Sequence, residues 1–193
     1  MSTRLVLVAL SLVGWTSGSA WALSEESPHH RDPYWYVNHS CVLAAAQRYQ
    51  ISPQILEAHV YVESRGNPYA VSVPKGGQPN SLGGLTYSTA HQRVQQLSRK
   101  GVMLDVGLAQ INSTHMHRFG LDPVVLLDPC TNLQWAAYVI RDNINRYGET
   151  WTAVGRYVGS PKVPTEVLQS YSWKIYQALH VLQRVRQQRG VVR

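Results

Sequence analysis

The chain has 193 residues, a formal net charge of +7 and two cysteines. That length fits one domain with a buried core. After residue 22 no apolar run approaches membrane-spanning length, so we expect the mature protein to be soluble. A basic surface suits an acidic polymer, and both nucleic acid and cell wall are acidic polymers.

Residues 1–22 have the pattern of a cleavable export signal. Arg4 precedes an apolar run over Leu5–Gly14, and Ala20-Trp21-Ala22 supplies the small-x-small site for cleavage after Ala22. The apolar run is shorter than the roughly 20 residues that cross a bilayer as a helix. The alternative is an uncleaved anchor. We therefore expect a periplasmic protein, and export argues against nucleic acid as its partner.

The rest of the chain divides by composition. Residues 23–37 form a polar lead-in, residues 38–183 carry the domain, and residues 184–193 form a basic tail with four arginines. A solvated, frayed end is a better interpretation of this tail than a binding patch. No repeat or low-complexity segment interrupts the domain, and we expect it to act as a monomer.

Apolar spacing and capping residues predict a mainly helical domain. Ser52 and Pro53 open a helix that ends near Arg65, before Gly66. Residues 71–86 are rich in Gly, Pro, Ser and Asn, which predicts a loop or a short hairpin. The other predicted helices begin near Ser40, after Ser88 as N-cap, after Asn112, near Asp128, at Trp151 and at Pro164.

Both cysteines, Cys41 and Cys130, lie in the portion that would be exported. In an oxidising compartment such a pair most simply forms a disulfide. The chain-entropy model gives about 4–5 kcal/mol for closing a loop of this length. A metal site is the weaker alternative, because no histidine stands at ligand spacing from either cysteine. The pair His115 and His117 also lacks the i, i+4 spacing of a helical metal site, so we expect no metal or other cofactor.

Glu63 is the informative residue of the helix that Ser52 opens. At 100° per residue from Ile55, the apolar side chains fill one arc, and Glu63 falls inside it at about 80°. Glu57 falls at about 200° and is expected to face water. A carboxyl group on a buried arc keeps its proton more readily, as does one near the negative end of a helix. The pattern therefore favours a general acid, with a buried ion pair to Arg141 or Arg156 as the alternative.

Three motifs in order carry a family resemblance. Glu63 to Ser72 fits the pattern E-S-x-x-x-P-x-A-x-S; Gly-Leu-Ala-Gln-Ile-Asn follows at 107–112 and Ala-Val-Gly-Arg-Tyr at 153–157. Over about residues 38–160 the chain resembles the lytic transglycosylases of the goose-type lysozyme superfamily. The small members associated with secretion, conjugation and pilus systems are the most similar. The resemblance implies a lysozyme-like, mainly helical α+β fold in one domain with a groove.

The resemblance also implies roles for single residues. Glu63 corresponds to the catalytic acid/base, Ser72 approaches the substrate, Gln110 lines the sugar groove, and Tyr157 stands for a tyrosine whose hydroxyl lies near the acid. Asn112 can bind sugar amides and hydroxyls as Gln110 can, and Gly107 allows a close backbone approach. The alternatives are a helix-start cap for Gln110 and Asn112, and core packing for Tyr157.

Two departures stand out. Tyr157 is followed by Val-Gly-Ser where the family has Asn-x-Gly, which puts the geometry behind Tyr157 in question. The link between Ser72 and Gly107 is also long, so we expect an inserted loop and helix over about residues 73–105 beside the groove. This insertion either narrows substrate choice or docks a partner.

The family's chemistry needs one carboxylate. The resemblance implies that Glu63 protonates the oxygen between N-acetylmuramic acid and N-acetylglucosamine in peptidoglycan glycan strands, and then takes a proton from the muramyl 6-hydroxyl. The product would be a 1,6-anhydromuramyl end, in aid of an envelope-spanning apparatus. Asp105 is the second carboxylate nearest the motifs and more plausibly caps the Gly107 turn. A hydrolytic muramidase and a non-catalytic wall-binding scaffold remain as alternatives.

Overall fold

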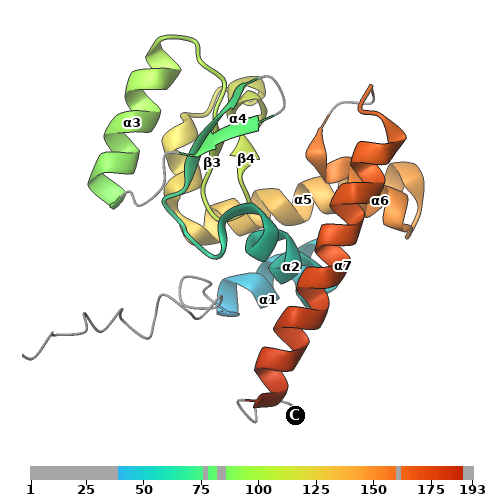
Figure 1. Cartoon of the computed structure of the whole chain (residues 1–193). Helices are drawn as coiled ribbons and strands as arrows, with labels where there is room; N and C mark the ends of the chain where they lie inside the picture. Colours follow the sequence, from blue (N-terminus) through green and yellow to red (C-terminus); the bar gives the residue numbers. More distant parts are fainter. Residues whose placement is uncertain (1–38, 76–77, 82–85, 160–161, 189–193) are drawn as a thin grey trace, which may run out of the picture.

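A computed structural model describes residues 39–75, 78–81, 86–159 and 162–188; the expected signal at 1–22 and the lead-in at 23–37 lie outside these ranges. Helices dominate the described part (Figure 1). The α-helices are α1 (His39–Tyr49), α2 (Pro53–Ser64), α3 (Tyr87–Arg99), α4 (Ser113–Arg118), α5 (Pro129–Tyr147), α6 (Trp151–Gly155) and α7 (Thr165–Gln188), with 3-10 helices η2 (Pro123–Leu127) and η3 (Arg156–Val158). None of the described helices is long and apolar enough to cross a bilayer.

Four short strands form one antiparallel sheet in the order β2-β1-β3-β4. Their bounds are β1 (Val71–Lys75), β2 (Gln78–Ser81), β3 (Asp105–Val106) and β4 (Ile111–Asn112). The β1–β2 hairpin confirms the hairpin interpretation of residues 71–86. Ser72 pairs with Asp105, and Asp105 pairs with Asn112, so these three polar residues form a row on one face of the sheet.

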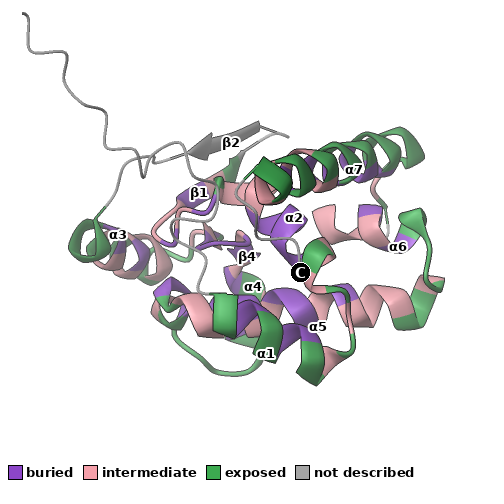
Figure 2. Ribbon diagram, turned by 90° about the horizontal axis from the view of Figure 1, so that it is seen from below, coloured by how far each residue is buried: buried purple, intermediate pink, exposed green. Residues whose placement is uncertain are grey.

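Helix α2 lies at the centre of the molecule. Its residues from Leu56 to Val60 are all buried, and α1, α5 and α7 contact it (Figure 2). One apolar cluster joins α1, α2, α3, the sheet and α5, and a second joins Ala58 of α2 to the inward face of α7. The outer faces of α3 and α7 remain exposed. Because α2 contributes residues to both clusters, it connects the part of the fold that carries the sheet to the part that carries α7.

Capping residues set most helix ends where the sequence predicts them. Ser52 accepts a hydrogen bond from the Ile55 amide at the start of α2, and Asp128 accepts one from Thr131 at the start of α5. The prediction of Ser88 as the N-cap of α3 is wrong by two residues, because Thr86 accepts the hydrogen bond from the Thr89 amide. A hydroxyl at either position could cap a helix, and spacing alone does not choose between them.

Cys41 and Cys130 form a disulfide, as predicted. The bond joins α1 to the first turn of α5, with a Cα–Cα distance of 5.1 Å in the normal range. It therefore links the first described helix to the long helix on which the sheet and α6 also pack.

The prediction that Glu57 faces water is wrong. Its side chain is buried, at 3 % exposure, and accepts from the guanidinium of Arg186; the Nδ1 of His39 lies 3.6 Å from its other oxygen. Helix α7 runs on through Gln188 and so carries Arg186 of the basic segment onto α2. A helical wheel of α2 alone contains no information about a cation 129 residues further along the chain.

Candidate active site

Glu63 lies in the last turn of α2, half-buried and facing α7. The hydroxyl of Tyr171 donates a hydrogen bond to its Oε1. Burial raises the pKa of the Glu63 carboxyl to about 7; the Tyr171 hydrogen bond opposes this shift, the charge of Asp105 adds to it, and Lys174 lowers it slightly. A carboxyl group with this pKa carries its proton for about half the time at neutral pH, as a general acid requires.

The ion-pair alternative for Glu63 is wrong. Arg141 donates from Nε to the carbonyl oxygen of Tyr49 at 2.7 Å, and Arg156 lies over the ring of Tyr147, 5.1 Å from its centroid. Within the described ranges no basic side chain forms an ion pair with Glu63. Among the described residues the carboxyl is therefore bound by a neutral donor, and the charge of Lys174 acts on it only weakly and without an ion pair.

The Gly-Leu-Ala-Gln segment forms a tight turn beside the end of α2. Gly107 has φ of +80°, and a Cβ there would lie 2.2 Å from the Nδ2 of Asn132 and 2.4 Å from the carbonyl oxygen of Leu126. The fully buried Asn132 holds the turn by accepting from the Ala109 amide at 2.8 Å and donating to Val106 at 2.8 Å. Both the space and the backbone angle therefore require glycine at 107.

The three motifs of the resemblance meet at this turn. Ser64, next to Glu63, donates to the carbonyl oxygen of Leu108 at 2.6 Å, and Tyr157 donates to that of Ala109 at 2.8 Å. The turn is thus fixed on one side to the end of α2 and on the other to η3. Residues that are 44 and 48 positions apart in sequence become neighbours around one carboxyl group.

Gln110 and Ser72 are bound to each other and to the turn. The Ser72 hydroxyl donates to the Gln110 Oε1 at 2.8 Å, and the Gln110 Nε2 donates to the carbonyl oxygens of Ala70 and Gly107 at 3.1 and 3.0 Å. Gln110 itself has φ of +47°. In this geometry its amide stabilises the turn, and the contact with sugar stays a prediction for both residues.

Asn112 takes the role of a helix cap, the alternative given by the sequence. Its Oδ1 accepts from the Thr114 amide at 3.0 Å, and its Nδ2 donates to Asp105 at 2.8 Å. Asp105 does not cap the Gly107 turn, because it pairs in β3 and the Gly107 amide donates to Ala70 instead. Strand pairing, not turn capping, thus holds Asp105 near the acid, and burial raises its own pKa.

Two tyrosines and a histidine lie behind Glu63. The rings of Tyr157 and Tyr171 are stacked, with centroids 6.2 Å apart and planes 7° apart, and His59 lies 4.5 Å from the Tyr157 ring. Burial and then the charge of Glu63 raise the pKa of both tyrosine hydroxyls. Tyr157 is thus near the acid, as the resemblance implies, but the hydroxyl that donates to Glu63 is that of Tyr171.

The sequence motifs did not identify Tyr171 as a site residue, and its hydrogen bond to Glu63 appears only in the structure. The residue is 108 positions from Glu63, beyond the motifs that carry the resemblance. The available signal was chemical: a tyrosine on a buried stripe needs a partner for its hydroxyl, and the buried carboxyl of Glu63 could have been proposed as that partner.

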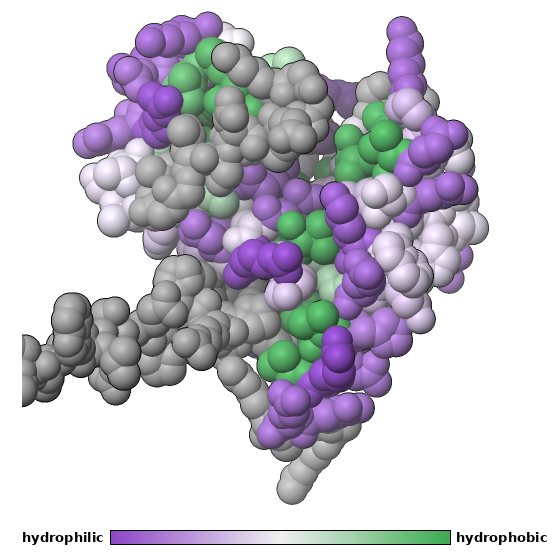
Figure 3. Space-filling model, viewed as in Figure 1, coloured by the Kyte–Doolittle hydropathy of each residue, from purple (hydrophilic) through white to green (hydrophobic). Residues whose placement is uncertain are grey.

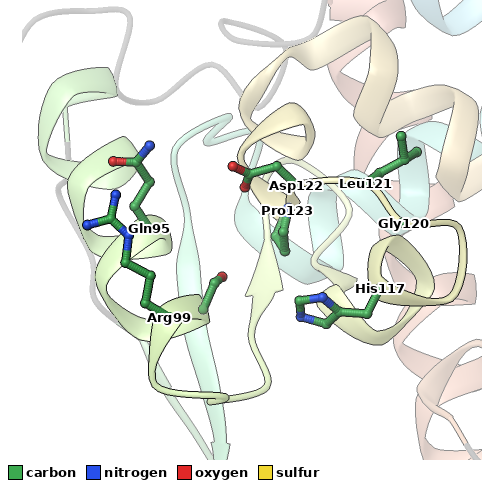
Figure 4. A pocket seen from close by; sticks show the side chains of 8 residues that line it. Gln95, Arg99, His117, Gly120, Leu121, Asp122 and Pro123 are labelled. Carbon is green, nitrogen blue, oxygen red and sulfur yellow. The ribbon is translucent and has the colours of Figure 1, made fainter.

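The molecular surface is hollowed between the part that carries α3 and the sheet and the part that carries α6 and α7 (Figure 3). A separate pocket of about 440 Å³ lies between α3 and the segment after α4 (Figure 4). It is lined by Gln95, Ser98, Arg99, His117, Gly120, Leu121, Asp122 and Pro123, none of which belongs to the cluster around Glu63. The catalytic candidates therefore do not lie in this pocket.

Comparison with known proteins agrees with the geometry of the three motifs. The model of the transglycosylase SLT domain matches residues 40–178. The chain belongs to this family. Its fold is accordingly the lysozyme-like α+β fold that the resemblance implied.

Individual relatives share moderate sequence identity with parts of this chain. The chain is 34 % identical to the type IV secretion system protein virB1 of Brucella abortus over 108 residues, which are 54 % of this chain and 43 % of that protein. It is 28 % identical to the invasion protein IagB of Salmonella typhimurium over 142 residues, 71 % of this chain and 73 % of IagB. Protein virB1 of Agrobacterium fabrum is 38 % identical over 90 residues, 47 % of this chain and 36 % of that protein. The chain thus spans less than half the length of the virB1 proteins it matches.

Proposed function

We propose that this chain is a peptidoglycan lytic transglycosylase that cleaves the β-1,4 bond between N-acetylmuramic acid and N-acetylglucosamine without water. The observation that carries the proposal is Glu63, a carboxyl group that forms no ion pair with any described residue and whose pKa lies near 7 beside the Gly107–Gln110 turn. Family membership supports the same reaction class.

In the proposed reaction Glu63 acts twice. Its proton passes to the glycosidic oxygen, the bond from that oxygen to the muramyl C1 breaks, and N-acetylglucosamine leaves as the alcohol. The Glu63 carboxylate then accepts the proton of the muramyl 6-hydroxyl, and the oxygen of that hydroxyl bonds to C1. The products are a 1,6-anhydromuramyl end and a restored acid, so no co-reactant is consumed.

The half-buried position suits both steps. In the acid form burial favours the neutral carboxyl, and after proton transfer the Tyr171 hydroxyl stabilises the carboxylate by donating to it. Ser72, Gln110, Asn112 and Tyr157 are proposed to bind sugar at this site. Of these, Gln110 belongs to the turn next to Glu63, and Tyr157 donates to that turn from η3.

A hydrolytic muramidase is the second candidate, and one observation favours it. Asp105 is a second carboxylate whose charge acts on Glu63, and most glycosidases use two carboxyl groups. A water held by Asp105 would attack C1 in place of the 6-hydroxyl. The two candidates share Glu63 as the acid and differ only in the attacking oxygen.

The site of action is proposed to be the periplasm, with export directed by residues 1–22. Two relatives are named for secretion and invasion, the type IV secretion system protein virB1 and the invasion protein IagB. We propose that this chain likewise opens the wall locally for an envelope-spanning apparatus, whose components would be its protein partners. The mature chain is proposed to act as a monomer.

Mass spectrometry of digested sacculi tests the reaction. Wild-type protein is expected to release anhydromuropeptides, which are lighter by one water than the reducing-end products of hydrolysis. Glu63→Gln is expected to lower the release rate by at least about 10²–10⁴-fold, the usual contribution of a general acid. Products with the mass of hydrolysis would favour the muramidase, and undiminished release by Glu63→Gln would overturn the role of Glu63 in either reaction.

A further inference from the structure

His59 is a buried histidine near Glu63 that has no role in the proposed reaction. His59 lies on α2 one turn before Glu63, and its side chain is fully buried. A buried imidazole is more often a packing residue than a functional one, so its surroundings must decide between the two. Its ring lies against the two tyrosines beside Glu63, and backbone groups of Ile55 and Val154 also act on it.

The ring of His59 lies between α2 and the tyrosine pair. Its centroid is 4.5 Å from that of Tyr157 and 5.9 Å from that of Tyr171, with the planes tilted by 57° and 51°. Both tyrosines use their hydroxyl groups at the site, Tyr157 on the turn and Tyr171 on Glu63. His59 therefore packs against the rings of both tyrosines.

One hydrogen bond fixes the orientation of the imidazole. Its Nδ1 lies 2.8 Å from the carbonyl oxygen of Ile55, which can only accept, so the neutral ring carries its proton on Nδ1. Its Nε2 is buried and has no hydrogen-bond partner among the described residues. An apolar side chain could fill the space, but it would lack the bond to Ile55 that holds the ring at this angle.

The imidazole must also be neutral for the site to work. A cation one helical turn from Glu63 would favour the carboxylate and remove the proton that the acid step needs. Burial lowers the pKa of His59 to about 4, so the ring is uncharged wherever Glu63 is close to half-protonated. His59 thus supports the tyrosines without adding a charge.

We propose that His59 is a positioning residue for the acid/base: its neutral ring holds Tyr171 and Tyr157 so that the Tyr171 hydroxyl reaches Glu63. The proposal rests on the proposed function and extends it to a residue outside the three motifs. It predicts that losing the ring acts through Tyr171 and not through the stability of the fold.

A double-mutant cycle tests this coupling. His59→Leu has similar volume but no ring, and we expect it to lower kcat about tenfold with KM within about twofold, as Tyr171→Phe does. Because both changes remove the same hydrogen bond, His59→Leu/Tyr171→Phe is expected to be no slower than Tyr171→Phe alone. His59→Phe keeps an aromatic ring but lacks the Nδ1 hydrogen bond to Ile55, so it is expected to recover only part of the lost kcat.

Two measurements distinguish a positioning role of His59 from a purely structural one. The alkaline limb of the pH–rate profile should move to higher pH in His59→Leu, since the Tyr171 hydrogen bond lowers the pKa of Glu63. Leu182→Ala is the matched control, because Leu182 belongs to the same apolar cluster as Tyr171 but lies about three turns further along α7. It should lower the melting temperature and leave the alkaline limb of the pH–rate profile unchanged. Multiplied losses in the double variant, or an unmoved limb in His59→Leu, would overturn the proposal.

The assay of wild-type protein distinguishes failure of the proposed reaction from failure of the positioning role of His59. If wild-type protein releases no anhydromuropeptides, the proposed function fails. The positioning proposal is then judged by ¹³C-carboxyl NMR alone, where the titration midpoint of Glu63 should move upward in His59→Leu as it does in Tyr171→Phe. A midpoint that moves in Tyr171→Phe but not in His59→Leu would refute it.

Discussion

Two glutamates six residues apart on α2 have opposite environments. Glu57 is buried against the guanidinium of Arg186, with His39 nearby, whereas Glu63 is half-buried against the hydroxyl of Tyr171. Burial is common to both, so burial alone does not make a catalytic acid. A cation stabilises the charged carboxylate and makes it part of the fold, and a neutral donor leaves the carboxyl free to bind and release a proton.

The largest expected effect comes from removing the cation. Arg186→Met leaves Glu57 buried without its partner, and we expect the free energy of unfolding to fall by about 3 kcal/mol, the lower end for broken buried pairs. Urea denaturation measures it. Arg184→Met, on an exposed neighbour in α7, is the control and should change stability by less than about 0.5 kcal/mol. A drop in kcat at 25 °C without a drop in stability would contradict the structural assignment of Glu57.

The opposite sign is expected at Glu63. Its folded-state pKa of about 7 exceeds the ordinary value of 4.5, so the stability that its proton contributes is complete below pH 4.5 and is lost as pH rises through 7. Glu63→Gln should therefore raise the free energy of unfolding at pH 8 by about 3 kcal/mol and leave it unchanged at pH 4. Glu57→Gln should lower it at pH 8. Equal responses of the two variants would remove the distinction between the two sites.

A smaller effect is expected from the neutral donor. Tyr171→Phe removes the hydrogen bond to Glu63 and should lower kcat/KM about tenfold at pH 6. Because that bond lowers the pKa of Glu63, the alkaline limb of the pH–rate profile should move to higher pH. Tyr176→Phe, on the exposed side of the same helix, should leave both unchanged. A limb that moved downward would show that Tyr171 does not donate to Glu63.

The smallest effect is expected from Asp105. Its negative charge raises the pKa of Glu63, so Asp105→Asn should move the alkaline limb to lower pH. The change in kcat/KM at pH 7 should be under about threefold, the scale of a screened charge. A loss of several hundredfold would instead indicate a second catalytic carboxylate and favour hydrolysis, which the mass of the products would then test.

Local signals predicted the elements that position the site. Ser52 and Pro53 mark the start of α2, Asp128 marks the start of α5, and the apolar arc of α2 correctly contains Glu63. Each of these depends on residues within one or two turns of the helix concerned. The disulfide was also predictable, because with two cysteines only one pairing exists.

Distant partners could not be predicted in this way. Glu57 forms its ion pair with Arg186, and Glu63 accepts its hydrogen bond from Tyr171, both on a helix that packs against α2 from the far end of the chain. The helical wheel of α2 assigns each side chain either to the apolar core or to water. It cannot represent a polar side chain that is buried because another helix covers it and supplies a residue of opposite charge. The same limit hid the role of Asn132 behind the Gly107 turn.

Titration of the two carboxyl groups by ¹³C NMR, with glutamate labelled at Cδ, tests the central claim most directly. Glu63→Gln assigns its resonance, and Glu57→Gln assigns the other. We expect the Glu63 carboxyl to titrate with a midpoint of about 7 in the folded protein, well above the ordinary value of 4.5. A midpoint near 4.5 would show that the carboxyl is ionised at neutral pH, and would contradict its assignment as the general acid.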